Sequence, residues 1–227
     1  EENQIHQNFV NLSNSLDTIK TYYLLGAEDL EKFKEISQSI NSVSSSKTLL
    51  DNYVHSNSAQ LFTVLVEKMN SLNEMVQKAK SELNSFENYL HSLKEDSQEA
   101  SNLIRDYFNK TRDKESELRL LNVDVLNKRY APRFQEIYSI IDALYADLMK
   151  MPINVKKVQS EMADLKSKGD SLLADVETTK SDLQNAEKSI LNANRYRNDD
   201  TATDQLVSQA EAMFANTSYK EAYNALK

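Results

Sequence analysis

The sequence contains no cysteine and no tryptophan, and it has only two glycines and two prolines among its 227 residues. The absence of cysteine excludes disulfide bonds and catalysis by a thiol. Average chains contain roughly 7% glycine and 5% proline, so a chain this poor in turn residues is expected to have few turns and long helices. No uninterrupted apolar run approaches the ~18 residues of a membrane-spanning helix.

The charge balance is acidic, with 27 Lys and Arg residues against 35 Asp and Glu residues, a net charge of −8. This balance argues against a nucleic acid or an anionic lipid surface as the main partner. The length suggests one or two domains. The sequence begins with Glu1 rather than Met and ends while a helical pattern is still running, so we expect a soluble piece of a longer protein.

Apolar residues recur at alternating steps of three and four residues. The four series run over residues 5–40, 62–107, 134–151 and 155–193. A sustained repeat of 3.5 residues is typical of packed helices that supercoil to the left. We therefore predict an all-α fold: an elongated rod of antiparallel helical bundles with long shared helices, ending in a short helical hairpin. The helix over 62–107 would be about 70 Å long at ~1.5 Å per residue, and small-angle scattering would test the rod.

The breaks between the series are polar. Residues 41–48 and 55–60 are rich in Ser and Asn, and one of them is expected to turn the first helix back on the second. The heptad is lost over 121–134. Pro132 and Pro152 each precede a fresh apolar series, as expected for prolines in a first helical turn.

Near the end, "NDDTATD" (198–204) supplies candidate N-caps, and Ser218 and Glu221 have the spacing of a capping box. Both glycines, Gly26 and Gly169, fall at heptad positions. A glycine inside a helix costs roughly 1 kcal/mol relative to alanine. Two interpretations stay open for them: a core gap or close helix crossing, and a bend.

Residues that could carry catalysis are scarce. His6, His55 and His91 are isolated, and neither Glu-x-x-His nor His-Glu-x-x-His occurs. Two separate glycines cannot build a loop that cradles phosphate. Carboxylate pairs such as Asp142 and Asp147 are expected to lie on solvated helix faces. We therefore expect no enzyme, no metal and no cofactor.

The stretch "ILNANRYRNDD" (190–200) changes from basic to acidic and has two compatible interpretations. Arg195 and Arg197 could stabilise a helix C-terminus, by roughly 0.3–1 kcal/mol each, with Asp199 and Asp200 starting the next helix. Alternatively, Asn194, Arg195 and Arg197 form a patch that contacts a partner at a helix–helix corner.

Several segments carry a resemblance to a known family. They are "KMPINVKKV" (150–158), "ANRYR" (193–197) and "AEAMFANTSYKEAYNAL" (210–226), with looser agreement in "YYLLGAEDLEKF" (22–33) and "TRDKESELRLL" (111–121). Together they resemble the C-terminal part of the septation ring formation regulator EzrA. The family has a localisation patch, Gln-x-x-Asn-Arg. Asn194 and Arg195 match its last two residues, whereas Leu191 stands at the position of the Gln.

The resemblance implies a bent rod of spectrin-like three-helix repeats under the membrane of low-GC Gram-positive bacteria. The expected repeats are residues 1–112 and 113–227. The family's N-terminal membrane helix is not in this sequence. Its members restrain assembly of the tubulin-like FtsZ and help to bring septal wall-synthesis proteins to the division septum.

The main functional hypothesis is therefore a non-enzymatic cytoplasmic scaffold and regulator of cell division. It would bind FtsZ and other division proteins through Asn194, Arg195 and Arg197. One alternative is a surface-exposed or secreted helical adhesin, which a cleavable signal sequence would distinguish. A second is an enzyme within a helical bundle, which would need buried polar clusters that the heptad positions lack.

Overall fold

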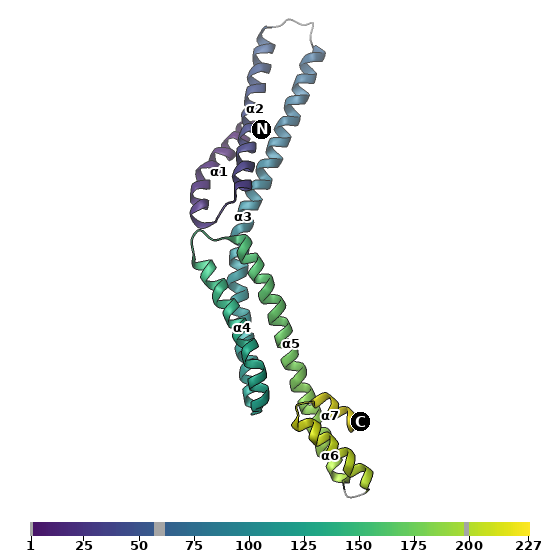
Figure 1. Cartoon of the computed structure of the whole chain (residues 1–227). Helices are drawn as coiled ribbons and strands as arrows, with labels where there is room; N and C mark the ends of the chain where they lie inside the picture. Colours follow the sequence, from purple (N-terminus) through teal and green to yellow (C-terminus); the bar gives the residue numbers. More distant parts are fainter. Residues whose placement is uncertain (1, 57–61, 198–199) are drawn as a thin grey trace. The chain divides into compact units, whose positions relative to one another are not determined.

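A computed structural model describes residues 2–56, 62–197 and 200–227. In these ranges the chain forms α-helices and one short 3-10 helix, and the predicted all-α class is confirmed. The elements are α1 (Glu2–Tyr22), α2 (Ala27–Ser56), α3 (Phe62–Leu120), α4 (Asp124–Met149), α5 (Val155–Ala193), η2 (Asn194–Tyr196), α6 (Thr201–Ala215) and α7 (Tyr219–Ala225) (Figure 1). The long helix predicted over 62–107 is present, and it continues to Leu120.

The chain divides into two compact units that are discontinuous in sequence. The first unit comprises Glu1–Ala100 and Ala146–Gln159, and the second comprises Ser101–Tyr145 and Ser160–Lys227. The helices α3, α4 and α5 each contribute to both units because each runs across a boundary between them. The two repeats predicted from the sequence, 1–112 and 113–227, stay a prediction.

In the first unit, α1, α2 and α3 pack through an aromatic column. The ring of Phe33 in α2 stacks on Phe9 of α1 with centroids 5.3 Å apart, and it contacts Phe86 of α3 at 5.9 Å. Aliphatic residues at heptad positions of the same three helices, such as Leu12, Ile40 and Leu83, are also buried. Aromatic pairs of this geometry add roughly 0.5–1.5 kcal/mol beyond the area that they bury.

In the second unit, α3 and α5 run in the same direction with a fixed register. Three polar contacts join residues that are 63 positions apart, or nine heptads: Tyr107 with Asp170, Lys114 with Glu177 and Lys180 with Glu117. Because the offset is a whole number of heptads, the same type of contact recurs at heptad intervals along the two helices. The core beneath these contacts includes Tyr130, Phe134, Leu144, Leu165, Leu172 and Val176.

The sequence misplaced the first turn. Its first series ran unbroken to residue 40, but the helix stops at Tyr22 and α2 begins at Ala27. The intervening loop pairs with the loop before α5: Leu24 N–H donates to the Ile153 carbonyl at 2.9 Å, and Ile153 N–H donates to the Tyr22 carbonyl at 2.8 Å. Gly26 therefore lies before a helix rather than inside one, and its N–H donates to Asp29 Oδ2 at 2.8 Å.

Of the two polar segments predicted as the next turn, residues 41–48 are instead helical and belong to α2. Of the segment 55–60, residues 55 and 56 are the last two of α2, and the others lie outside the described ranges. Three heptad positions near the starts of α2 and α3 are also exposed rather than buried, namely Leu30, Phe62 and Met69. A heptad position therefore did not ensure burial near the start of these two helices.

The expectation for the prolines was wrong at both positions. Helix α4 begins at Asp124, so Pro132 lies in its interior. A proline there removes one backbone hydrogen bond and typically costs ∼3 kcal/mol or more. Leu126, Tyr130 and Phe134 are buried around it, so the packed face of α4 continues on both sides of the proline. Pro152 lies in the loop before α5, whose N-terminus is capped by Asn154 Oδ1, which accepts the Lys157 N–H at 3.1 Å.

Gly169 does lie in a helix interior, and α5 continues through it. The glycine is buried against Tyr107 of α3. A Cβ added at Gly169 would lie 2.5 Å from Tyr107 Cε1 and 2.6 Å from Tyr107 Cδ1. Of the two interpretations left open by the sequence, this contact supports the close helix crossing.

Candidate partner-binding surface at the end of α5

The residues of the predicted patch lie where α5 gives way to η2. Leu191 is in the last turn of α5, and Asn194 and Arg195 are the first two residues of η2. All three are exposed, with 61% of Leu191 accessible. Spacings of three and four residues place side chains on the same side of a helical segment. These three residues therefore form one exposed edge, which we call the α5 edge.

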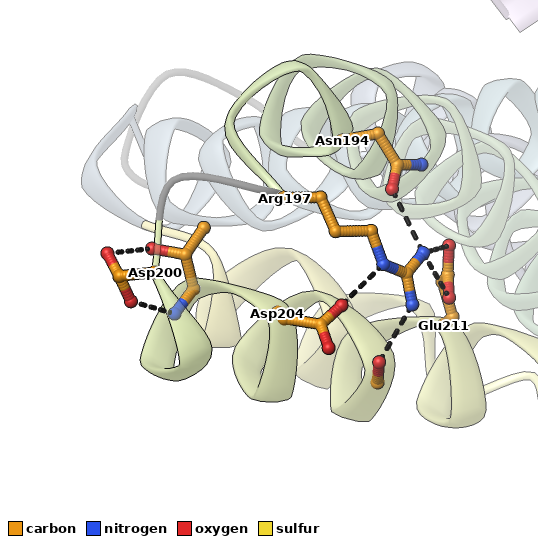
Figure 2. Close-up of polar contacts among 7 residues, drawn as sticks. Asn194, Arg197, Asp200, Asp204 and Glu211 are labelled. Carbon is orange, nitrogen blue, oxygen red and sulfur yellow. Dashed lines mark hydrogen bonds and ion pairs between the residues drawn. The ribbon is translucent and has the colours of Figure 1, made fainter.

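Arg197 does not extend this edge, because its guanidinium is held against α6 (Figure 2). Its Nε donates to Asp204 Oδ1 at 2.7 Å, and Nη1 donates to both carboxylate oxygens of Glu211 at 3.0 and 3.1 Å. Nη2 donates to Ser208 Oγ at 2.8 Å. The planar guanidinium suits such divergent acceptors, which a lysine ammonium could not all reach.

One contact joins Arg197 back to the predicted patch. Its Nη1 donates to Asn194 Oδ1 at 3.2 Å, and its backbone N–H donates to the Asn194 carbonyl at 3.4 Å. Hydrogen bonds to Asp204, and then to Glu211, raise the pKa of the Arg197 guanidinium further above its ordinary value. The positive charge of Arg197 is thus offset locally by two carboxylates.

The start of α6 confirms one N-cap predicted from the sequence. Asp200 Oδ1 accepts the Thr203 N–H at 2.7 Å, and Oδ2 accepts the Thr203 hydroxyl at 2.9 Å. These hydrogen bonds stabilise the carboxylate, so the pKa of Asp200 is lowered. Asp199, predicted to start the same helix, lies outside the described residues. Ser218 precedes α7 as predicted, but its side chain makes no capping hydrogen bond, so the capping box with Glu221 is not formed.

A groove lies beside α6, apart from the contacts of Arg197. It has a volume of about 560 Å³ and lies between the end of α5, η2, α6 and the end of α7. Its lining residues are Ser189, Asn192, Ala193, Tyr196, Thr203, Leu206, Val207, Ala225, Leu226 and Lys227. Val207 is fully buried, whereas Tyr196 is 61% exposed and Leu206 is 48% exposed. The groove therefore has an apolar base at Val207, and its walls combine exposed apolar side chains with polar ones.

The structure thus divides the three sequence-predicted residues. Asn194 and Arg197 are brought together, whereas Arg195 is exposed and forms no ion pair with the described residues. The sequence interpretation missed the two carboxylates that hold Arg197. Their spacing, Asp204 to Glu211, is two helical turns and was the available signal. It also missed the groove, for which Tyr196 between two arginines was the only local indication.

Other functional chemistry is sparse in the described ranges. They contain no group of three or more His, Cys, Asp or Glu side chains that could hold a metal ion. Among their helices, none combines the length and the apolar character needed to cross a membrane. Of the carboxylates singled out in the sequence, Asp147 forms an ion pair with Lys157, and Asp142 is exposed.

Comparison with known proteins gives one consistent result. The chain matches the family described as "Septation ring formation regulator, EzrA" over residues 2–227. Proteins called septation ring formation regulator EzrA from two strains of Staphylococcus epidermidis are each 22% identical over 213 residues, covering 93% of this chain. The protein of that name from Bacillus pumilus is 18% identical over 163 residues, covering 72% of this chain.

The match concerns only part of each relative. It covers 37% of the Staphylococcus epidermidis proteins and 29% of the Bacillus pumilus protein. No solved structure matches the chain significantly. The family match nevertheless extends from α1 to α7 and includes the α5 edge, Arg197 and the groove. The chain therefore belongs to the septation ring formation regulator EzrA family.

Proposed function

We propose that this chain is a non-catalytic binding part of a cell-division regulator that contacts FtsZ, and through it the septal machinery, at the cytoplasmic face of the division septum. Membership of the septation ring regulator family supports a role in cell division. The described elements are helices, so helix surfaces are the candidate means of contact with a partner. Binding through surfaces is the ordinary function of long helical bundles.

The single observation that carries the proposal is the state of Arg195. It is exposed on the α5 edge and forms no ion pair with the described residues, whereas Arg197 two positions later is fully engaged with α6. A free guanidinium beside an exposed amide can donate several hydrogen bonds to a carboxylate on a partner. Asn194 extends this donor surface, and Leu191 adds an exposed apolar side chain to the same edge.

Co-sedimentation with FtsZ polymers would test this. The double variant Asn194→Ala with Arg195→Ala is expected to fold with an almost unchanged melting midpoint, because exposed substitutions usually stay within about ±0.5 kcal/mol. Its binding to FtsZ polymers should fall. In the full-length protein, recruitment to mid-cell should fall as well.

The chain offers a matched control for this variant. Asn102 and Arg105 are also an exposed Asn and Arg on one helix, three residues apart, with a hydrogen bond of 2.8 Å from Arg105 Nη2 to Asn102 Oδ1. Replacing both by Ala should leave polymer binding intact. The proposal is wrong if both double variants bind like the parent chain, or if the Asn194 and Arg195 variant melts several degrees lower and still localises normally.

A further inference from the structure

The groove beside η2 is lined by large apolar side chains that remain exposed. Tyr196 and Leu206 stand in its walls with about half or more of their surfaces exposed, above the buried Val207. A concave site of 300–1,000 Å³ with apolar walls and few polar groups is the usual form of a binding pocket. At about 560 Å³, this groove is large enough to take apolar side chains from a partner.

Charged residues around the groove favour an acidic occupant. Lys227 lines it, and Lys188 lies one helical turn before the lining residue Asn192. Arg195 adjoins Tyr196. None of these three cations forms an ion pair with the described residues, although the chain as a whole carries a net charge of −8.

Most acidic residues close to the groove already have hydrogen-bond or ion-pair partners. Asp200 caps α6 through Thr203, and Asp204 is paired with Arg197. Glu221 is the exception. It lies one turn before Ala225 on α7, so it would repel an acidic ligand at that side. A carboxylate of the occupant is therefore expected at the α5 side, near Arg195 and Lys188.

A second copy of this chain fits the groove poorly. A symmetric dimer would bring the same surface to itself, so the cations Arg195, Lys188 and Lys227 of both copies would outnumber the Glu221 carboxylates there. Like charges across an interface cost several kcal/mol. The cations therefore favour a different protein.

We propose that the groove between η2, α6 and the end of α7 binds a short segment of a partner protein in which large apolar side chains stand next to carboxylates. The apolar side chains enter between Tyr196 and Leu206, and a carboxylate accepts hydrogen bonds from Arg195. This inference rests on the proposed function, because it names the kind of segment that the division partner presents. Arg197 contributes only indirectly, by holding α6 in the position that forms the groove.

Fluorescence polarisation of the 227-residue chain with a labelled synthetic peptide would test the groove. The probe carries a Phe-Leu pair beside several Asp residues, and two control peptides replace either the Asp residues by Asn or the Phe-Leu pair by Ser. We expect the probe to bind and each control peptide to bind about tenfold more weakly or worse. Equal binding of all three peptides would overturn the proposal.

Matched variants assign the binding to this groove. Tyr196→Ser should weaken probe binding about tenfold or more, whereas Tyr145→Ser, at a tyrosine that is 54% exposed on α4, should not. Arg195→Glu should weaken it, whereas Arg105→Glu should not. If Tyr196→Ser binds like the parent, the groove is not the site. If instead the parent sediments as a dimer that Tyr196→Ser dissociates, the occupant is a second copy and the proposal is wrong.

The failure of this inference can be distinguished from failure of the proposed function. If FtsZ polymers bind the parent chain and the Tyr196→Ser variant equally, the groove proposal is wrong while the proposed function stands. If the parent binds the acidic-apolar peptide but no FtsZ polymer, the groove stands and its partner is another protein.

Discussion

Replacing Gly169 by alanine tests the packing of α3 on α5 most directly. Alanine in a helix interior is normally better than glycine by roughly 1 kcal/mol, so the change should stabilise an unconstrained helix. Here a Cβ would lie 2.5 Å from Tyr107 Cε1, well inside van der Waals contact. Tyr107 is only 5% exposed, and its hydroxyl donates to Asp170 Oδ1 at 2.6 Å, so its ring cannot move aside without losing that hydrogen bond.

The two effects oppose one another, and the clash is expected to be the larger. Forcing extra atoms into a packed core typically costs about 1–3 kcal/mol, and more when backbone must shift. Loss of the Tyr107 hydrogen bond to a carboxylate adds to this. After subtracting the helix-propensity gain, we expect Gly169→Ala to destabilise the chain by about 1–2 kcal/mol. For a chain of this length that is a fall of about 2–8 °C in the melting midpoint.

Thermal unfolding followed by far-UV circular dichroism measures this, with two controls. Gly26→Ala places its Cβ 3.5 Å from Asp29 Oδ2, an ordinary contact, so its midpoint should change little. Tyr107→Leu removes the ring that causes the clash. In that background Gly169→Ala should be much less harmful, giving a coupling energy above the ~0.5 kcal/mol expected for independent sites. A midpoint that rises in Gly169→Ala, or a coupling near zero, would refute the reasoning.

Two further predictions concern ionic contacts of the second unit. Arg197→Ala should lower the thermal midpoint, and Arg197→Lys should restore it only in part, because the three donors of a lysine lie on one nitrogen, which cannot reach both Asp204 and Glu211 as the Arg197 guanidinium does. Equal midpoints for parent and variants would contradict this. Lys180 and then Lys114 lower the pKa of Glu117, and Lys114 lowers that of Glu177. The stability that these carboxylates contribute is present above their ordinary pKa near 4.5 and is lost as the pH falls through their lowered values. The free energy of unfolding, measured with urea, should therefore fall less steeply between neutral and acidic pH for Glu117→Gln than for the parent chain. The same dependence on pH in both would contradict the assignment.

The heptad pattern predicted helices well because it reports a local property. Apolar positions such as Leu83, Leu172 and Val176 recur at the helical period, and burial of one face supplies most of a helix's stability. Tyr107 and Gly169 both fall at heptad positions, but the pattern does not say which position of one helix meets which position of the other. Composition, through the scarcity of glycine and proline, indicated the fold class independently.

The turns were predicted less well because distant residues decide them. The loop between α1 and α2 is tied by hydrogen bonds to Ile153, far along the chain, and Gly26 was its local signal, although the apolar repeat continued through it. Conversely, Pro132 is a strong local signal that tertiary packing overrides, because Tyr130 and Phe134 are buried on either side of it. Both errors arise where long-range contacts outweigh local preference.

The candidate site shows the same division between local and distant information. The sequence placed Asn194 and Arg195 away from the packed face, and both are exposed. The same register returned Arg197 to a heptad position, but the sequence did not identify the acceptors that hold it, because they lie on α6, one and two turns apart along that helix. The two arginines of this region therefore have different roles. Arg197 uses its charge to fix α6 beside the end of α5, which both shapes the groove and leaves Arg195 as the cation that a partner's carboxylate can reach.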